Sequence, residues 1–165
     1  MRFTLRSYHR FPVQCTLVLA SLCATSVWAG WKEGHDAYEH GDYATALNEW
    51  GPMAQQGDAG VQLMLGTMYE EARGVAQDYR EAARWYRLAA DQGNQFAQVN
   101  LGNLYVEGQG VPQDFVQAHM WFNLAGSAGS KKAIKSRDIL AKKMTPVQIA
   151  EAQKLAREWK PIKNQ

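Results

Sequence analysis

Apolar and polar positions in the central part of the chain repeat with a period of 36 residues. Residues 61–93 align with residues 97–129 without a gap and match at 14 of 33 positions. Within each copy a leucine and a tyrosine lie four residues apart, so both fall on one face of a helix. A repeat of this length is typical of a solenoid, in which stacked helical units share one core.

Each unit predicts two antiparallel helices joined by a loop that contains glycine. Gly66 and Gly102 fall on the apolar face of the first helix, where a glycine costs about 1 kcal/mol relative to alanine. We expect the second helix to approach closely at that point and compensate for this cost. Asp78 and Asp114 are suitable N-caps for the second helix, and Glu or Gln three residues later completes a capping-box pattern. The signature positions are Leu65, Gly66, Tyr69, Gly74, Asp78, Ala82, Trp85 and Gly93 in the first copy, and Leu101, Gly102, Tyr105, Gly110, Asp114, Ala118, Trp121 and Gly129 in the second.

Incomplete units flank the two complete repeats, which we place at residues 59–94 and 95–130. Residues 30–58 reproduce the second-helix pattern one period earlier and form an N-terminal partial repeat. Residues 131–165 have lost the Leu-Gly pair and form a degenerate repeat, as terminal units often do. Their last helix starts well, because Thr145 is a good N-cap and proline follows it. The sequence predicts an all-α fold, an α-solenoid of antiparallel helix pairs with a C-terminal capping helix.

The large aromatic side chains of the second helices fall at equivalent repeat positions, so we expect them in the core between helices. A nucleic-acid stacking platform is excluded, because residues 30–129 contain 5 Lys and Arg against 13 Asp and Glu. Residues 130–165 are instead basic, with 10 Lys and Arg against 3 Asp and Glu. The aromatic residues concerned are Trp50, Trp85, Tyr86, Trp121 and Phe122.

These residues resemble the Sel-one-like repeat, a relative of the tetratricopeptide repeat. The motifs are Ala-x-x-x-Leu-Gly-x-x-Tyr, Gly-x-Gly-Val-x-x-Asp and Ala-x-x-Trp-Tyr/Phe-x-x-Ala-x-x-x-Gly, and they span residues 59–129. One departure is Ala72, where the second copy has Gly108. If this position requires a positive φ, alanine is strained there. The resemblance implies an α-solenoid that serves as a protein-interaction scaffold or adaptor.

The first 29 residues have the features of a secretory signal peptide. Arg2, Arg6 and Arg10 form a positive segment, and residues 13–24 form an apolar segment too short to span a bilayer comfortably. A Val-Trp-Ala motif ends at Ala29 and offers small residues to signal peptidase. We expect cleavage after Ala29 and a periplasmic or secreted protein without a stable membrane anchor. The alternative is a short amphipathic or buried N-terminal helix.

No motif for catalysis or metal binding stands out after the leader. Both cysteines precede residue 30, so the mature chain has neither a disulfide nor a catalytic thiol. His35, His40 and His119 lack metal-ligand spacing, and we expect them to be exposed to solvent. We predict no catalytic residue, no metal and no cofactor. The alternative function is a cell-envelope hydrolase of the β-lactamase-like type associated with cysteine-rich relatives, which the missing cysteines disfavour.

In tetratricopeptide-like solenoids the first helix of each unit lines the concave face, and the resemblance places a binding surface there. We expect a protein or peptide partner and no nucleic acid. The predicted partner-binding residues are Tyr38, Glu39, Leu63, Thr67, Glu70, Glu71, Val99, Asn103, Val106 and Glu107.

A basic segment follows this acidic and apolar set. It could dock on the chain's own acidic groove and cap it, or both patches could engage one partner, or both could be solvated faces. Carboxylates grouped in a groove attract a cationic partner and make its binding sensitive to salt. The basic residues are Lys131, Lys132, Lys135, Arg137, Lys142 and Lys143.

Overall fold

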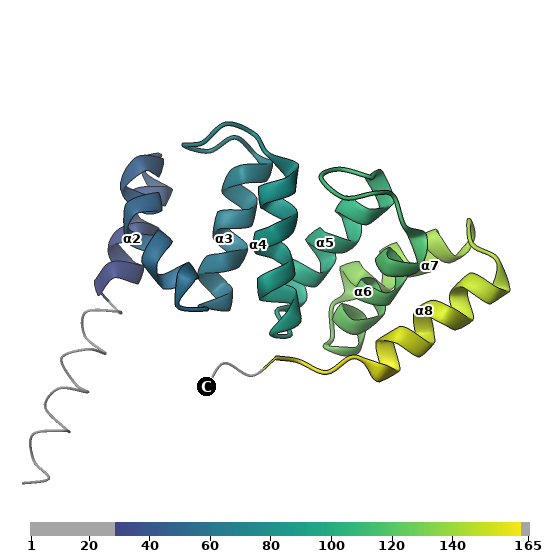
Figure 1. Cartoon of the computed structure of the whole chain (residues 1–165). Helices are drawn as coiled ribbons and strands as arrows, with labels where there is room; N and C mark the ends of the chain where they lie inside the picture. The colour runs from purple at the N-terminus through teal and green to yellow at the C-terminus, as the bar shows by residue number, and fades with distance from the viewer. Residues whose placement is uncertain (1–28, 163–165) are drawn as a thin grey trace, which may run out of the picture.

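The computed structural model describes residues 29–162, and every regular element in that range is a helix (Figure 1). This confirms the predicted all-α fold, whereas the predicted leader, apart from Ala29, lies outside the described residues. None of the described helices is both long and apolar enough to cross a membrane. After a helical segment at residues 29–39 the helices are α2 (Tyr43–Gln55), α3 (Ala59–Glu70), α4 (Tyr79–Asp91), α5 (Gln95–Glu107), α6 (Phe115–Ser127), α7 (Lys131–Ala141) and α8 (Pro146–Glu158).

Each helix from α2 to α8 begins at a side chain that accepts hydrogen bonds from the first turn. Such a cap contributes about 1 kcal/mol, and the predicted caps Asp78 and Asp114 are confirmed. The capping-box prediction is wrong in its second half at both caps, because the backbone N–H of Asp78 donates to the carbonyl of Tyr69 and that of Asp114 donates to the carbonyl of Tyr105, each at 3.0 Å. The Glu81 carboxylate instead pairs with Arg84 Nη2 at 3.0 Å. A complete box forms at Thr145. The N-caps are Asp42, Asp58, Asp78, Asn94, Asp114, Ser130 and Thr145.

The tryptophans of the second helices pack between consecutive units, as predicted. Trp50 of α2 and Trp85 of α4 share an apolar cluster with Leu65 of α3. Trp121 of α6 is 1% exposed and packs with Leu101 of α5 and residues of α4. The core is therefore a continuous series of inter-helix layers, in which each layer joins one unit to the next.

A buried glutamine ties each first helix to the second helix of the preceding unit. Gln62 Nε2 donates to the carbonyl of Ala54 at 3.0 Å, and Gln98 Nε2 donates to the carbonyl of Ala90 at 3.2 Å. Both carbonyls lie near the C-terminal end of a helix, where intrahelical donors run out. The same bond at the same repeat position holds both joints in one geometry.

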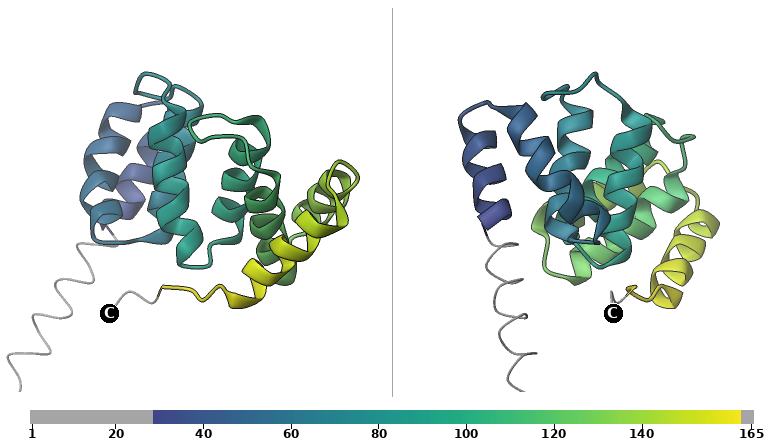
Figure 2. Two further views of the ribbon diagram at one scale, coloured as in Figure 1. Left: turned by 45° about the vertical axis from the view of Figure 1, so that its right-hand side comes forward. Right: turned by 60° about the vertical axis from the view of Figure 1, so that its left-hand side comes forward.

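The last helix does not extend the hairpin pattern. It packs on α6 rather than on α7, the helix that precedes it, and so lies against the second helices (Figures 1 and 2). The Trp159 ring meets the Trp121 ring edge to face, with centroids 6.3 Å apart. Beyond it, the backbone N–H of Ile162 donates to the carbonyl of Asp91 at 2.7 Å. The predicted capping helix thus closes the solenoid by folding back toward α4.

The expectation that all three histidines are exposed is wrong for His119. This side chain is 3% exposed on α6, at the position that Ala83 occupies in the first repeat. Its Nδ1 atom is buried without a hydrogen-bond partner. Burial, followed by the positive charge of Arg137, lowers its pKa. His40 is exposed, as expected, and His35 is half-buried.

The loop after α3 contains a strained alanine. Ala72 has a φ of 57°, and Gly108 at the equivalent position has a φ of 70°. Left-handed backbone suits glycine but brings the Cβ of an alanine against the following carbonyl. Ala72 therefore has the positive φ for which the sequence analysis expected strain.

Replacement of the tryptophan in the second joint should destabilise the whole array. Removal of a buried aromatic side chain typically costs about 3–5 kcal/mol, a large part of the roughly 5–15 kcal/mol of a small protein. We expect Trp121→Ala to be partly unfolded at 37 °C in a thermal melt followed by circular dichroism. Trp31→Ala is the matched control, because Trp31 is 40% exposed. A Trp121→Ala midpoint within about 2 °C of the parent would contradict the packing role.

Relief of the loop strain should stabilise the fold. We expect Ala72→Gly to raise the free energy of unfolding by about 0.5–1 kcal/mol, because the relieved left-handed strain exceeds the added unfolded-state entropy. Urea titration measures the change. The reverse substitution, Gly108→Ala, should destabilise, since a Cβ there would also lie 3.3 Å from Gln113 Cβ. Equal midpoints for parent and Ala72→Gly would show that the loop relaxes without cost.

Candidate functional site

Two glycines let an aromatic ring from each second helix pack directly against its first helix. A Cβ on Gly66 would lie 2.5 Å from the Tyr86 ring, and a Cβ on Gly102 would lie 2.6 Å from the Phe122 ring. These distances confirm the predicted close approach. Both rings are buried. We call the surface formed by the segment 29–39, α3, α5 and α7 the first-helix surface.

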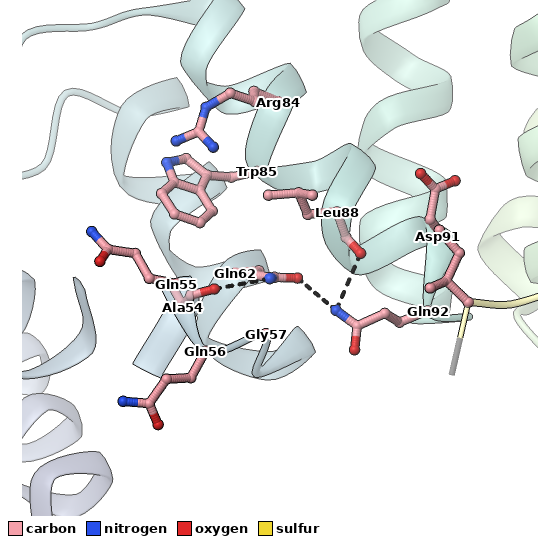
Figure 3. A pocket seen from close by; sticks show the side chains of 11 residues that line it. Ala54, Gln55, Gln56, Gly57, Gln62, Arg84, Trp85, Leu88, Asp91 and Gln92 are labelled. Atoms are coloured by element: carbon pink, nitrogen blue, oxygen red, sulfur yellow. Dashed lines mark hydrogen bonds between the residues drawn. The ribbon is translucent and has the colours of Figure 1, made fainter. Parts of the chain in front are cut away.

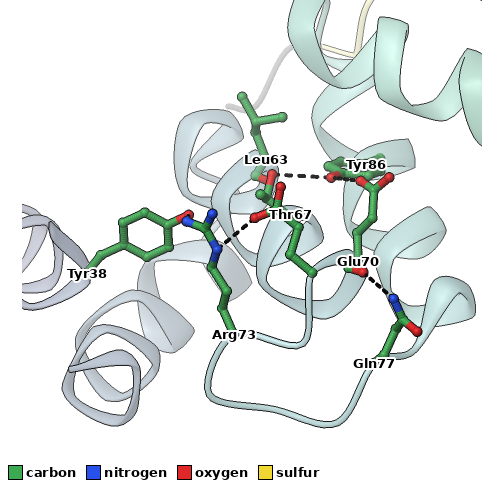
Figure 4. A network of polar contacts seen from close by, with 8 residues as sticks. Tyr38, Leu63, Thr67, Glu70, Arg73, Gln77 and Tyr86 are labelled. Atoms are coloured by element: carbon green, nitrogen blue, oxygen red, sulfur yellow. Dashed lines mark hydrogen bonds and ion pairs between the residues drawn. The ribbon is translucent and has the colours of Figure 1, made fainter. Parts of the chain in front are cut away.

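In the first repeat the ring ends in a polar cluster. The Tyr86 hydroxyl donates to Glu70 Oε2 at 2.5 Å and lies 3.2 Å from Thr67 Oγ1 (Figure 4). Thr67 in turn donates to the carbonyl of Leu63. Burial first, and the Glu70 carboxylate second, raise the pKa of Tyr86 far above its ordinary value. Tyr86 therefore remains a neutral donor that holds Glu70 in place.

A second polar contact joins the first helical segment to the loop after α3. Arg73 donates from Nη1 to the Tyr38 hydroxyl and pairs through Nε with Glu71 Oε2 at 2.7 Å. Its guanidinium carbon also lies 5.3 Å from the centroid of the Tyr38 ring (Figure 4). Burial raises the pKa of Tyr38. Arg73 neutralises part of the acidic patch that the sequence predicted.

In the second repeat the same three positions form an apolar pocket of about 160 Å³. Asn103 stands at the position of Thr67, Val106 at that of Glu70 and Phe122 at that of Tyr86. Without a phenol or a carboxylate, the polar cluster cannot form, and α7 supplies further apolar walls. The pocket is lined by Asn103, Val106, Phe122, Ser136, Ile139, Leu140 and Lys143.

The structure brings together part of the predicted binding set. Glu39 and Glu107 are exposed on the same helices as the clusters above. Leu63 is half-buried and packs against the core cluster that contains Trp121. Val99 is a correction, because it is 4% exposed and packs inside the cluster around Phe122. Its side chain faces the neighbouring helices and is closed to a partner.

The basic segment forms no ion pair with the predicted acidic residues within residues 29–162. Arg137 pairs with Asp138 at 2.8 Å and donates to Asn123 Oδ1 at 3.1 Å. Lys143 instead lines the apolar pocket beside Asn103. In the described part of the chain, the basic segment therefore does not cap the predicted acidic residues through salt bridges.

Several residues of the site were missed from the sequence. Ser136 and Ile139 belong to the degenerate third unit, where the repeat pattern gives no guidance, yet Ile139 is 51% exposed at the pocket. Arg73 could have been noticed, because the second copy has Gln109 at its position. In the range that the structure describes, no three His, Cys, Asp or Glu side chains converge on a possible metal position.

Comparisons with known proteins place this geometry in a family. Residues 59–94 and 95–130 each match the family model of the Sel1 repeat. The crystal structure of c5321, a protective antigen present in uropathogenic Escherichia coli strains displaying an SLR fold, has a TM-score of 0.76 and 31% identity, over 81% of this chain and 29% of that one. The chain thus spans less than a third of c5321. No curated protein matches the chain.

The second solved structure is matched over almost its full length. A Sel1 repeat protein from Oxalobacter formigenes has a TM-score of 0.64 and 31% identity, over 76% of this chain and 98% of that one. With both repeats matched as well, the chain belongs to the Sel1 repeat family.

Proposed function

We propose that this chain is an exported scaffold that binds a protein or peptide through its first-helix surface. Proteins built from Sel1 repeats generally serve as protein-interaction scaffolds, which supports a binding role. The observation that carries the proposal is the open apolar pocket between α5 and α7, with the Asn103 amide at its edge. A surface that offers one apolar pocket beside one polar amide suits recognition of another chain.

The chemistry of the pocket favours an extended peptide. A volume of about 160 Å³ accommodates one aliphatic side chain or a small ring. The Asn103 amide has both donor and acceptor atoms, so it can bond a peptide group of the partner. The exposed carboxylate of Glu107, at the C-terminal end of α5, would favour a basic residue next to the inserted side chain.

The polar cluster of the first repeat would set the direction of the peptide. Glu70 is held by Tyr86, so its carboxylate is presented without the freedom of an ordinary surface side chain. A side chain that is already ordered loses less entropy on binding. A second basic residue of the partner, toward α3, would meet this carboxylate.

Nothing in residues 29–162 supports the hydrolase alternative. The most strongly perturbed hydroxyl, that of Tyr86, has its pKa raised and is therefore less able to act as a nucleophile. The buried His119 lies without a hydrogen-bond partner on Nδ1, so no third group orients it for base catalysis.

Changes at the pocket edge should weaken binding without unfolding the protein. The partner is first identified by affinity capture from the cell envelope and mass spectrometry. We expect Asn103→Ala with Glu107→Lys to weaken the purified pair by tenfold or more, about 1.4 kcal/mol, with an unchanged melting temperature.

A matched control reverses the same charge elsewhere. Glu158 ends α8 as Glu107 ends α5, and both are exposed, so Glu158→Lys should bind normally. Unchanged binding in the double variant, with loss from substitutions on the second helices, would move the binding surface to the other side of the solenoid.

Export is tested on the N-terminus of the protein. We expect the chain recovered from an envelope fraction to begin at Gly30, since the Val-Trp-Ala motif ends at Ala29. Intact-mass analysis distinguishes this product from the full chain. A mass that includes residues 1–29, or a diacylglyceryl adduct, would contradict the proposal.

A further inference from the structure

A second open groove lies on the opposite set of helices, between α2 and α4. We call it the α2–α4 groove; it has a volume of about 470 Å³ and takes in the C-terminal turn of α2, Gln62 of α3 and one face of α4. Trp85 and Leu88 present apolar atoms to it, beside the hydrogen bond from Gln92 to Gln62 (Figure 3). Leu88 is 40% exposed. An apolar side chain is thus left open at a point where the repeat brings two second helices together.

The residues that form this groove have counterparts 36 residues later, on α4 and α6. Trp121 stands for Trp85 and Leu124 for Leu88. The helices around the two positions are also held in the same way, because Gln62 and Gln98 donate to equivalent carbonyls at the ends of α2 and α4. The two grooves are therefore two copies of one structural feature.

In the second copy the groove is filled by the chain's own C-terminal helix. Leu155, Ala156 and Trp159 pack against the cluster that contains Trp121. The Trp159 side chain acts as a hydrogen-bonding neighbour of the Asp91 carboxyl and opposes the rise in its pKa that burial causes. Its ring lies 3.9 Å from a Cβ position on Gly93. The occupant that this feature accepts is thus the C-terminal end of an amphipathic helix, with Leu155 and Ala156 in the last turn of α8 and Trp159 directly after it.

The first copy lacks such an occupant among the described residues. α8 is already seated on α6, and the chain reaches only the margin of the α2–α4 groove, through Ile162. Trp85 keeps 8% of its surface exposed, against 1% for Trp121. The two grooves thus share their tryptophan and leucine, and they differ most in that no described helix covers the first one.

We propose that the α2–α4 groove binds an amphipathic helix of another protein that ends in a Leu-Ala-x-x-Trp segment, as α8 together with Trp159 does. Gln55 replaces Asp91 at the equivalent position, so its amide oxygen can accept the indole N–H of the incoming tryptophan. Arg84 replaces Met120 at the rim, where its guanidinium pairs with Glu81 at 3.0 Å and lies 4.0 Å from the centroid of the Trp85 ring.

This surface is separate from the first-helix surface. The pocket of the proposed peptide site is built by α5, α6 and α7, whereas the α2–α4 groove is built by α2, α3 and α4. No residue lines both. A solenoid with two independent docking surfaces can hold two partners at once.

The test uses a peptide from the chain's own sequence as the probe. A fluorescent synthetic peptide with the sequence of residues 145–162, which contains all of α8, is titrated into the purified chain and followed by anisotropy. We expect saturable binding that Leu88→Glu weakens by tenfold or more, because a carboxylate would be buried against Trp85. The peptide with Trp159→Ala should lose a similar factor. Leu88→Gln, which adds no charge, is the milder variant should Leu88→Glu melt early.

Matched variants distinguish binding in the α2–α4 groove from binding elsewhere on the chain. Ile139→Glu changes another exposed aliphatic residue, on the first-helix surface, and should bind the peptide normally. Loss of binding in Leu124→Glu together with normal binding in Leu88→Glu would show that the peptide displaces α8 from its own groove, and would overturn the proposal. Absence of saturable binding up to about 1 mM peptide would overturn it as well.

Self-association is the remaining alternative and is measured directly. Sedimentation of the chain alone reports whether α8 of one copy enters the α2–α4 groove of another. We expect a monomer, because α8 is seated within its own chain. A dimer that Leu88→Glu dissociates would make the occupant a second copy and would overturn the assignment to another protein.

Discussion

The close contact of two helices at a glycine sets the geometry of the whole solenoid. At Gly66 and at Gly102 any side chain would overlap an aromatic ring of the partner helix. The absence of a side chain lets that ring pack directly against the first helix. This contact fixes the spacing within each hairpin, and the buried tryptophans and glutamines then fix the spacing between hairpins. One local requirement thus sets the helix stacking on which the surface side chains are placed.

The two complete repeats show how one frame supports different surfaces. Tyr86 reaches through the glycine contact with a hydroxyl and organises Glu70, whereas Phe122 reaches through the same contact with a ring edge. The exchange of a few side chains turns a polar cluster into an apolar pocket while the backbone path is retained. Fold and binding chemistry are therefore largely separable in this chain, as expected when function lies in sites placed on a common architecture.

The C-terminal helix shows the opposite situation. The grooves between successive second helices share one backbone arrangement, but α8 fills only one of them. α8 closes the α4–α6 groove and stabilises the end of the solenoid, while the equivalent α2–α4 groove remains open. A terminal unit must hide an apolar face that no further repeat would cover. This chain meets that need by folding α8 back on α6, and not by pairing it with α7. The packing of α8 on α6 thereby shows which kind of helix a groove between two second helices can accept.

The amino-acid sequence alone predicts the repeat period and the helix pairs. It also predicts the caps at Asp78 and Asp114 and the place of the tryptophans in the core. These features depend on local spacing and on residues that recur 36 positions apart, so periodicity is enough to infer them. The tertiary structure was needed to show that Val99 and His119 are buried, that Arg73 holds Tyr38 and Glu71, and that α8 packs on α6. Each of these facts depends on which side chains from distant parts of the chain come into contact. In the degenerate terminal unit there is also no periodic pattern from which such contacts can be inferred.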